Sequence, residues 1–144
     1  MTLNQISVFV ENQTGKLQQL TEVLAKNRIN LRALSLAETS EFGIVRIIVD
    51  DTDAAAAVLA QEGFIHSITK VLGVAIPDEP GGLNRVLNVL SESSINVEYM
   101  YAFLGGKDTE HAYMIFRVQE AEEAVKALMA KGVKCIMQED LSNI

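Results

Sequence analysis

Apolar and polar positions follow two different spacings in the first half of the chain. Residues 6–10 place isoleucine and valine at every second position, as in a half-buried strand, whereas the leucines of residues 17–24 recur at helical spacing. Residues 31–37 and 44–49 are both rich in β-forming side chains and are separated by a polar stretch, which predicts a β-hairpin. The pattern therefore predicts a strand, a helix and a hairpin in that order.

A second helix and a short strand are predicted to follow this hairpin. Asp51 has a side chain typical of a helix N-cap, residues 54–61 are strong helix formers, and Gly63 stands where a C′ glycine belongs. Residues 64–68 then predict a short last strand.

The second half of the chain repeats this order of elements. When the sequence is shifted by 66 positions, residues 15–30 gain six identities with residues 81–96. Past the first hairpin the offset becomes 69, which places three added residues in the second hairpin loop, residues 105–110. The second copy is predicted to have a strand at 72–76, a helix at 83–90, hairpin strands at 97–104 and 112–118, a helix at 120–131 and a strand at 133–137.

Such a duplication predicts two small domains of the same fold, residues 1–70 and residues 71–144. In each domain the order βαββαβ favours an antiparallel sheet with both helices on one face. The expected fold class is therefore α+β, with two ferredoxin-like domains.

The predicted sheets have apolar residues on both faces. In residues 97–104, valine, tyrosine and phenylalanine occupy one set of alternate positions, and methionine, alanine and leucine occupy the other. Because the helices can cover only one face, we expect the other copy, a second chain, or both to cover the second. A loop or tail lying over that face is the alternative.

Composition and charge limit the partners of the chain. Its 144 residues are 49% hydrophobic, and 19 acidic against 12 basic residues give a net charge of -7. This charge repels phosphate backbones and anionic lipids, so neither nucleic acid nor a membrane is expected as a partner. The single Cys135 and the lack of a signal-like N-terminus favour a reducing, cytoplasmic location.

Two glycine-bearing turns carry a family resemblance. The second glycine turn, residues 78–82, is followed by Leu83 and is similar to the Asp-x-Pro-Gly-x-Leu turn of the ACT domain. The first glycine turn, residues 12–16, keeps Gly15 and is followed by Leu17, but it has Thr14 in place of proline and Asn12 in place of the acid. The chain thus resembles a stand-alone tandem ACT protein over nearly its whole length.

The resemblance implies a regulatory role without catalysis. ACT domains typically bind free amino acids where two such domains meet, and thereby regulate amino-acid metabolism. We therefore expect this chain to be a homodimeric sensor of a free amino acid, with no cofactor and no metal.

The residues themselves suggest how a zwitterion would be held. Gly15 and Gly81 lie where a strand passes into a helix, so backbone N–H groups can approach an anionic group closely. Asn30 and Asn96 each open the second strand and offer both a donor and an acceptor. Each glycine could instead serve only a tight turn, and each asparagine could cap the preceding helix. The candidate ligand-binding residues are Asn12, Thr14, Gly15, Asn30, Asp78, Glu79, Pro80, Gly81, Gly82 and Asn96.

Acidic and amide side chains at the turns suggest a ligand preference. Glu11, Asn12, Asp78 and Glu79 supply acceptors and negative charge, which favours an amino acid with a polar or cationic side chain, such as histidine. Alternatively, these acids partner the positive ends of the helices.

Other proteins share the order βαββαβ, so the site must decide between functions. An RNA-binding module needs a basic surface, a metallochaperone needs a Cys-x-x-Cys turn, and an acylphosphatase-like enzyme needs an arginine in the first loop. The chain has none of these features. The remaining alternative is a regulatory subunit, resembling the small subunit of acetolactate synthase, that docks on a catalytic enzyme.

Overall fold

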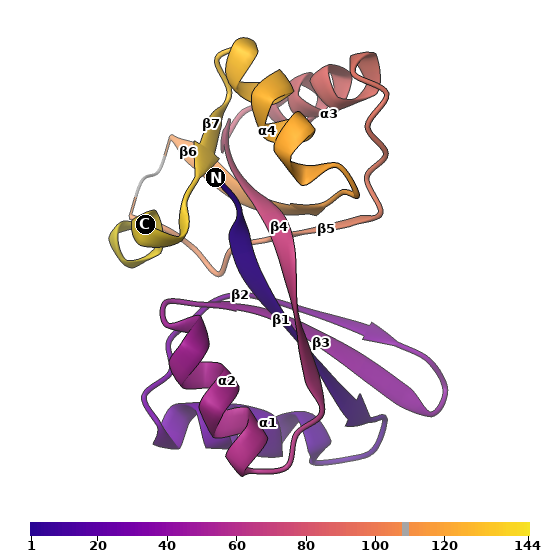
Figure 1. Ribbon diagram of the computed structural model, residues 1–144, viewed down its shortest axis with the longest axis vertical. Helices are drawn as coiled ribbons and strands as arrows, with labels where there is room; N and C mark the ends of the chain where they lie inside the picture. Colours follow the sequence, from indigo (N-terminus) through magenta and orange to yellow (C-terminus); the bar gives the residue numbers. More distant parts are fainter. Residues whose placement is uncertain (108–109) are drawn as a thin grey trace. The chain divides into compact units, whose positions relative to one another are not determined.

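The computed structural model describes residues 1–107 and 110–144, which form two compact units (Figure 1). The first unit consists of Asn4–Thr69, and the second consists of Met1–Leu3 together with Lys70–Ile144. Each unit has the order βαββαβ, so the predicted ferredoxin-like α+β fold is confirmed.

The first unit has a sheet in the order β2-β3-β1, followed by the N-terminal end of β4. Strand β3 is antiparallel to both β1 and β2. The two helices contact each other and lie on the same side of the strands (Figure 1). The elements are β1 (Leu3–Glu11), α1 (Lys16–Lys26), β2 (Leu31–Glu38), β3 (Phe42–Val49), α2 (Thr52–Gln61) and β4 (His66–Pro77).

The second unit repeats this arrangement, with β5 beside β6, β6 beside β4, and β7 on the other edge of β4. A short 3-10 helix, η1, follows β7 and was not predicted from the sequence. The elements after β4 are α3 (Gly82–Glu92), β5 (Tyr99–Ala102), β6 (His111–Arg117), α4 (Ala121–Ala130), β7 (Lys134–Ile136) and η1 (Gln138–Asn143).

Strand β4 corrects the predicted secondary structure. The sequence predicted two strands, at residues 64–68 and 72–76, but His66–Pro77 is one continuous strand of 12 residues. Residues 66–72 contain no glycine, proline, asparagine or aspartate that could form a turn, so nothing interrupts the extended backbone. The same strand is therefore the last of the first βαββαβ order and the first of the second.

Each unit has its own hydrophobic core beneath its helices. Helix α1 buries Leu20 and Leu24 in the first core, and α3 buries Val86 and Leu90 in the second. These residues are four apart, so each pair lies on one face of its helix. The predicted amphipathic helices are thus confirmed, although Leu17, the second residue of α1, is partly exposed.

The sheet face of the first unit that points away from the helices is unevenly buried. Gln5 and Ala33 are 0% exposed at one end, whereas Phe9 is 44% and Phe42 is 54% exposed at the other. What covers this face stays a prediction.

The loop between β5 and β6 contains residues 108 and 109, which lie outside the described residues. The three added residues predicted for this loop therefore fall partly outside the described structure. Among the helices of the described ranges, none is long and apolar enough to cross a membrane.

Candidate functional site

Both glycine turns contain a glycine with left-handed backbone angles directly before the helix. The φ angle is 85° at Gly15 and 84° at Gly81, a region that most other residues adopt only with strain. A Cβ atom placed on either glycine would meet no heavy atom within 4 Å. The backbone angle therefore explains why the turn needs glycine, and the space in front of each glycine is open.

Helices α1 and α3 begin directly after these glycines, and no side chain caps or neutralises their N-termini. Within the described residues, neither helix has a side-chain cap or an acidic residue in its first turn. By contrast, Asp51 caps α2 by accepting a 3.0 Å hydrogen bond from the Ala54 N–H, and α4 has Glu122 and Glu123 in its first turn. The N–H groups of Lys16 and Gly82 donate to carbonyls of their own turns, and the other first-turn N–H groups of α1 and α3 remain available to an anionic group.

Gly82 has a different role from Gly81. A Cβ atom at Gly82 would collide with the backbone carbonyl of Pro77, so this position needs glycine for the turn itself. The equivalent residue of the first turn is Lys16, whose N–H donates to the Gln13 carbonyl at 3.2 Å. The two turns therefore follow the same course, but only the second is tight enough to exclude a side chain there.

The two turns are attached to the tips of their hairpins by equivalent bonds. The Asn12 N–H donates to the Glu41 carbonyl, and the Asp78 N–H donates to the Glu110 carbonyl, both at 2.9 Å. The Asn12 side chain also donates to the Thr39 carbonyl at 3.0 Å. The predicted ligand residue Asn12 thus has a structural task, while no such side-chain bond holds Asp78 among the described residues.

The remaining predicted residues of the turns are exposed. Thr14 and Pro80 lie on the surface, and the Glu79 carboxylate forms an ion pair with Arg85 of α3. Both partners are 57% exposed, so the pair adds little to stability. It does neutralise one of the three acids, Glu11, Asp78 and Glu79, on which the preference for a cationic ligand rests.

A hollow lies between the glycine turn and the hairpin in each unit. In the second unit its volume is about 270 Å³, and Asp78, Ala102, Phe103 and Tyr113 are among the residues that line it. In the first unit the volume is about 70 Å³, and Asn12 and Leu36 are among the lining residues. The two hollows occupy equivalent positions, because Asn12 corresponds to Asp78 and Leu36 to Ala102 at the offset of 66.

The two hollows differ in the side chain at one equivalent position. Leu36 packs over Gly43 so closely that a Cβ atom on the glycine would lie 3.0 Å from the Leu36 Cδ1. In the second unit Ala102 replaces the leucine, and the rings of Phe103 and Tyr113 meet edge to face at 5.9 Å. The hollow of the second unit is therefore open and walled by aromatic rings.

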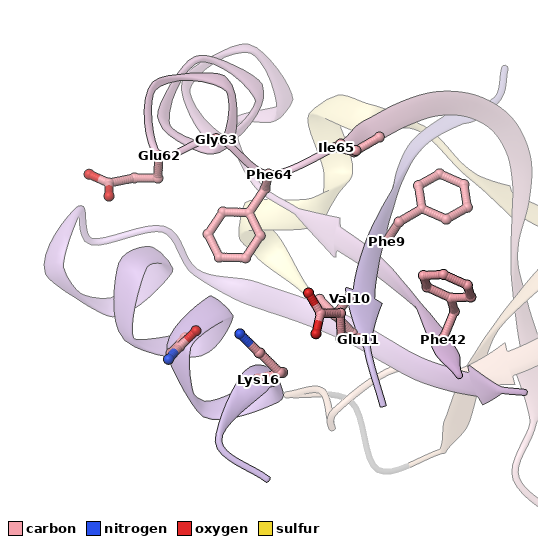
Figure 2. A pocket seen from close by; sticks show the side chains of 10 residues that line it. Phe9, Val10, Glu11, Lys16, Phe42, Glu62, Gly63, Phe64 and Ile65 are labelled. Carbon is pink, nitrogen blue, oxygen red and sulfur yellow. The ribbon is translucent and has the colours of Figure 1, made fainter. Parts of the chain in front are cut away.

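A further hollow of about 400 Å³ lies at the C-terminal end of β1 in the first unit (Figure 2). Phe9, Lys16 and Phe64 are among its lining residues, and no predicted ligand residue lines it. Sequence reasoning missed this hollow. The available signal was the pair of aromatic residues Phe9 and Phe42, whose counterparts in the second copy are Ala75 and His111.

The two asparagines lie far from the glycine turn of their own unit. Leu31, next to Asn30, pairs with Val49 at the base of the hairpin, whereas Glu38 pairs with Gly43 near its tip. Seven residues of strand separate the two ends by roughly 23 Å, at about 3.3 Å per residue. The glycine turn and the asparagine of one unit therefore cannot bind the same small ligand.

The bases of the two hairpins have related polar contacts. In the first unit, Asn30 Nδ2 donates to Asp50 Oδ2 at 3.2 Å, and Asp50 also pairs with Arg32 at 3.4 Å. The positions of Arg32 and Asp50 correspond to Glu98 and Gln119 of the second copy, where Gln119 donates to Glu98 at 3.2 Å. The cross-hairpin contact is thus kept while its charges change.

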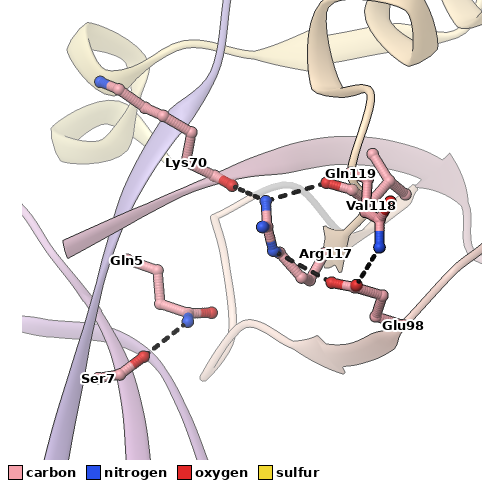
Figure 3. A network of polar contacts seen from close by, with 7 residues as sticks. All are labelled: Gln5, Ser7, Lys70, Glu98, Arg117, Val118 and Gln119. Carbon is pink, nitrogen blue, oxygen red and sulfur yellow. Dashed lines mark hydrogen bonds and ion pairs between the residues drawn. The ribbon is translucent and has the colours of Figure 1, made fainter. Parts of the chain in front are cut away.

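Arg117 extends this contact in the second unit (Figure 3). Its guanidinium donates to the carbonyls of Lys70 and Val118 at 3.2 and 3.0 Å and pairs with Glu98 at 3.2 Å. Asn96, two residues before Glu98 in the sequence, is exposed. Figure 3 also shows the buried Gln5–Ser7 hydrogen bond of the first unit, which is 3.0 Å long.

Comparison with known proteins identifies the family. The family described as ACT domain pair matches residues 1–144, so the chain belongs to the family of ACT domain pairs. The predicted resemblance is therefore confirmed, and membership of this family supports a regulatory, ligand-sensing role. No curated protein matches the chain.

Several solved structures are similar to the chain. Protein BT0572 from Bacteroides thetaiotaomicron is 39% identical, with a TM-score of 0.92 over 100% of this chain and 98% of that one. The ligand-free regulatory subunit of aspartate kinase from Thermus thermophilus is 17% identical, with a TM-score of 0.63 over 88% of this chain and 91% of that one. Aspartokinase III from E. coli, in complex with lysine and aspartate, is 14% identical, with a TM-score of 0.53 over 91% of this chain and 31% of that one. The two aspartate kinase structures, at 17% and 14% identity, show only that the fold is shared.

Proposed function

We propose that the chain is a non-catalytic sensor that binds a free amino acid and thereby regulates amino-acid metabolism. The observation that carries this proposal is the pair of glycine turns, each of which presents open space in front of an uncapped helix N-terminus. A carboxylate accepts hydrogen bonds from such N–H groups and is stabilised by the helix dipole. The other two helices, α2 and α4, have acidic residues in their first turns and lack this property.

The second glycine turn is the stronger of the two candidate sites. Its hollow of about 270 Å³ has Asp78, Phe103 and Tyr113 among its lining residues. A carboxylate suits the ammonium group of an amino acid, and aromatic walls suit a partly apolar or cationic side chain. The first turn lacks such a hollow because Leu36 fills the equivalent space.

Asn30 and Asn96 contribute to the same ligand only if another ACT domain supplies the glycine turn. This requirement follows from the distance between the two ends of each hairpin, and it agrees with a ligand held where two ACT domains meet. We expect that second domain to come from this chain or from its partner in a homodimer.

The preferred ligand is an amino acid with a polar or cationic side chain, such as histidine. Asp78 supports this preference, whereas Glu79 contributes less because Arg85 pairs with it. Lysine and aspartate are further candidates for a screen, since a distantly similar structure, E. coli aspartokinase III, was solved with both.

A thermal-shift screen with the twenty amino acids tests this function. A ligand at a hundredfold its Kd stabilises the folded chain by roughly 2.7 kcal/mol, which raises the melting temperature measurably. Gly81→Asn is the informative variant, because asparagine tolerates left-handed angles while its side chain fills the open space. We expect Gly81→Asn to remain folded and to lose the shift.

Gly15→Asn is the matched control, since it makes the same change at the first turn. We expect it to keep the shift produced by the ligand of the second turn. A flat response to all twenty amino acids, or an unchanged shift in Gly81→Asn, would contradict amino-acid binding at this turn.

Docking on a biosynthetic enzyme is the second candidate function. The chain matches nearly the full length of the aspartate kinase regulatory subunit, which is itself a separate chain, whereas it covers 31% of aspartokinase III. Size-exclusion chromatography with light scattering, followed by pull-down from native extract, separates the candidates. A lone homo-oligomer supports the free sensor, and stoichiometric co-purification of an enzyme supports the subunit.

A further inference from the structure

One end of the first unit's sheet carries an exposed apolar patch on the face away from the helices. Its members, Phe9, Phe42 and Ile65, are 44%, 54% and 74% exposed. Figure 2 shows the rings of Phe9 and Phe42 on the side of β1 opposite Lys16. A contiguous group of large exposed apolar side chains usually marks a surface that binds a partner.

The strand register makes this apolar patch continuous. Phe9 pairs with Ile44, and Phe42 stands two residues earlier in β3 on the same face. The two rings are therefore diagonal neighbours across β1 and β3. The Phe9 N–H also donates to the Ile65 carbonyl at 2.9 Å, which places the backbone of Ile65 beside Phe9 on the other edge of β1. The patch thus spans three neighbouring segments of backbone.

The fold does not require the apolar patch, because the second unit lacks it. Small or polar residues stand at the equivalent positions, Ala75, His111 and Lys134. Both units nevertheless have the same order of strands and helices. The patch therefore serves a contact rather than the fold.

In the second unit the chain packs its own apolar segment beside the corresponding hairpin. Segment η1 follows β7 and buries Leu141 completely, and Ile144 lies 3.5 Å from the position of a Cβ atom on Gly106. That position is also 3.1 Å from the ring of Tyr113, which corresponds to Ile44 at the offset of 69. Within the described residues the first unit has no such segment, since its last strand runs on as β4. A short apolar segment from another molecule can take this place.

Exposed acidic residues surround the apolar patch. Glu11 lies opposite Phe42 in the register, Glu41 directly precedes Phe42, and Glu38 is at the same end of the hairpin. Among the described residues, none of these three carboxylates forms an ion pair or a side-chain hydrogen bond. Arg46 is half-buried farther along β3 and already has a partner within the chain. A second copy would bring the same acids to the contact, so charge favours a basic partner over a second copy.

We propose that the apolar patch is a docking surface for a partner protein that presents apolar side chains flanked by lysine or arginine. Phe9, Phe42 and Ile65 bury the apolar side chains of the partner, and Glu11 and Glu41 at the rim pair with its basic groups. The proposal extends the second candidate function, docking on an enzyme, and it does not depend on amino-acid binding.

Fluorescence anisotropy of labelled model peptides with the full chain tests this surface. Three probes alternate leucine with lysine, with serine or with glutamate, and the fourth is the chain's own acidic segment, residues 137–144. We expect the leucine–lysine peptide to bind about tenfold more tightly than the others and to bind more weakly as the salt concentration rises. Phe42→Ser should weaken this binding about tenfold, and Glu41→Gln about threefold.

Matched controls make the same changes on another surface. Met129→Ser removes a side chain of α4 that is 49% exposed, and Glu123→Gln removes an exposed carboxylate from the same helix. Both variants should bind the leucine–lysine peptide as the parent chain does.

Three results would overturn the proposal. One is the absence of binding by the leucine–lysine peptide, or equal binding by Phe42→Ser, Ile65→Ser and the parent chain. Another is equally tight binding of any of the other three probes, which would remove the argument from charge. The third is a dimer in light scattering that dissociates in Phe42→Ser, which would make the patch a contact between copies. Circular dichroism establishes that each variant is folded, and Ile65→Ser keeps the test decisive if Phe42→Ser does not fold.

Failure of this proposal is distinguishable from failure of the proposed function. Gly81→Asn removes the site at the second glycine turn and should leave peptide binding unchanged. Phe42→Ser should leave unchanged the thermal shift produced by the ligand of the second turn.

Discussion

The first and second glycine turns share a backbone and differ in their surroundings. Both contain a left-handed glycine, both lead into a helix without a side-chain cap, and both are bonded to a hairpin tip by a 2.9 Å hydrogen bond. At the equivalent position beside the turn, however, Leu36 fills one hollow and Ala102 leaves the other open. Duplication has thus kept the backbone frame, which the fold needs, and changed the side chains, which decide what can bind.

A second difference between the units is a hollow that the first unit has next to the end of β1. The first unit has exposed phenylalanines there, where the second unit has small or polar residues. Two copies of one fold therefore need not carry two copies of one site.

The largest effect is expected from adding a methyl group to the second turn. Gly82→Ala places a Cβ atom against the Pro77 carbonyl, and neither backbone segment can move away without disturbing the turn. We expect a loss of about 2 kcal/mol in the free energy of unfolding. Urea denaturation followed by circular dichroism measures this loss.

Lys16→Ala is the control for that substitution, because the equivalent position of the first turn already carries a Cβ atom. It should change the free energy of unfolding by less than about 0.5 kcal/mol. If Gly82→Ala unfolds at the same urea concentration as the parent chain, the two turns are equally tolerant and the structural distinction between them fails.

The next effect concerns the hollow at the second turn. Ala102→Leu introduces the residue that the first unit has at the equivalent position, and Ala102 is exposed, so the core is not disturbed. We expect the filled hollow to weaken binding of the amino acid identified by the thermal-shift screen roughly tenfold or more. Isothermal titration gives the Kd.

Leu36→Ala makes the reverse change in the first unit, where the leucine is 51% exposed. It should leave that affinity unchanged. If both variants bind as the parent chain does, the ligand does not occupy the hollow beside Asp78.

The sequence predicted the fold because the fold depends on local patterns. Alternation in residues 6–10, the helical spacing of Leu20 and Leu24, and the cap at Asp51 each report on neighbouring residues alone. The prediction wrongly divided β4 into two strands because the repeat suggested a boundary there. The local pattern argued otherwise, since residues 66–72 contain no turn-forming residue.

The sites were harder to predict because they depend on residues far apart in the chain. The hollow beside Asp78 also involves Ala102 and Tyr113, and the hollow beside Lys16 involves Phe42 and Phe64. Sequence reasoning found the glycine turns, which are local, and placed Asn30 with them because both recur in the duplication. Recurrence shows that two positions matter to the fold, whereas only the strand register shows how far apart they lie.

A smaller effect is expected from the helix caps, which also differ between the units. Asp51→Ala removes the hydrogen bond from the Ala54 N–H and should lower the free energy of unfolding by about 1 kcal/mol. Glu120, the N-cap residue of α4, makes no side-chain cap bond, so Glu120→Ala should cost less than about 0.5 kcal/mol. Urea denaturation of both variants at pH 7 checks the difference, and equal losses would contradict the assigned role of Asp51.

The smallest effect is expected at Cys135, which has no thiol counterpart in the first unit because His66 stands at the equivalent position. Burial raises the pKa of the Cys135 thiol above its ordinary value, since desolvation disfavours the thiolate. The folded chain therefore holds this proton more tightly than the unfolded chain does. Its contribution to stability is complete at neutral pH and is lost only as the pH rises past the unfolded pKa toward the folded one. Alkylation by iodoacetamide should thus be slower in the native chain than in urea at pH 8, with the rate of the native chain rising at higher pH than that of the unfolded chain. Equal alkylation rates in the two states across this pH range would show that the thiol is exposed rather than packed in β7.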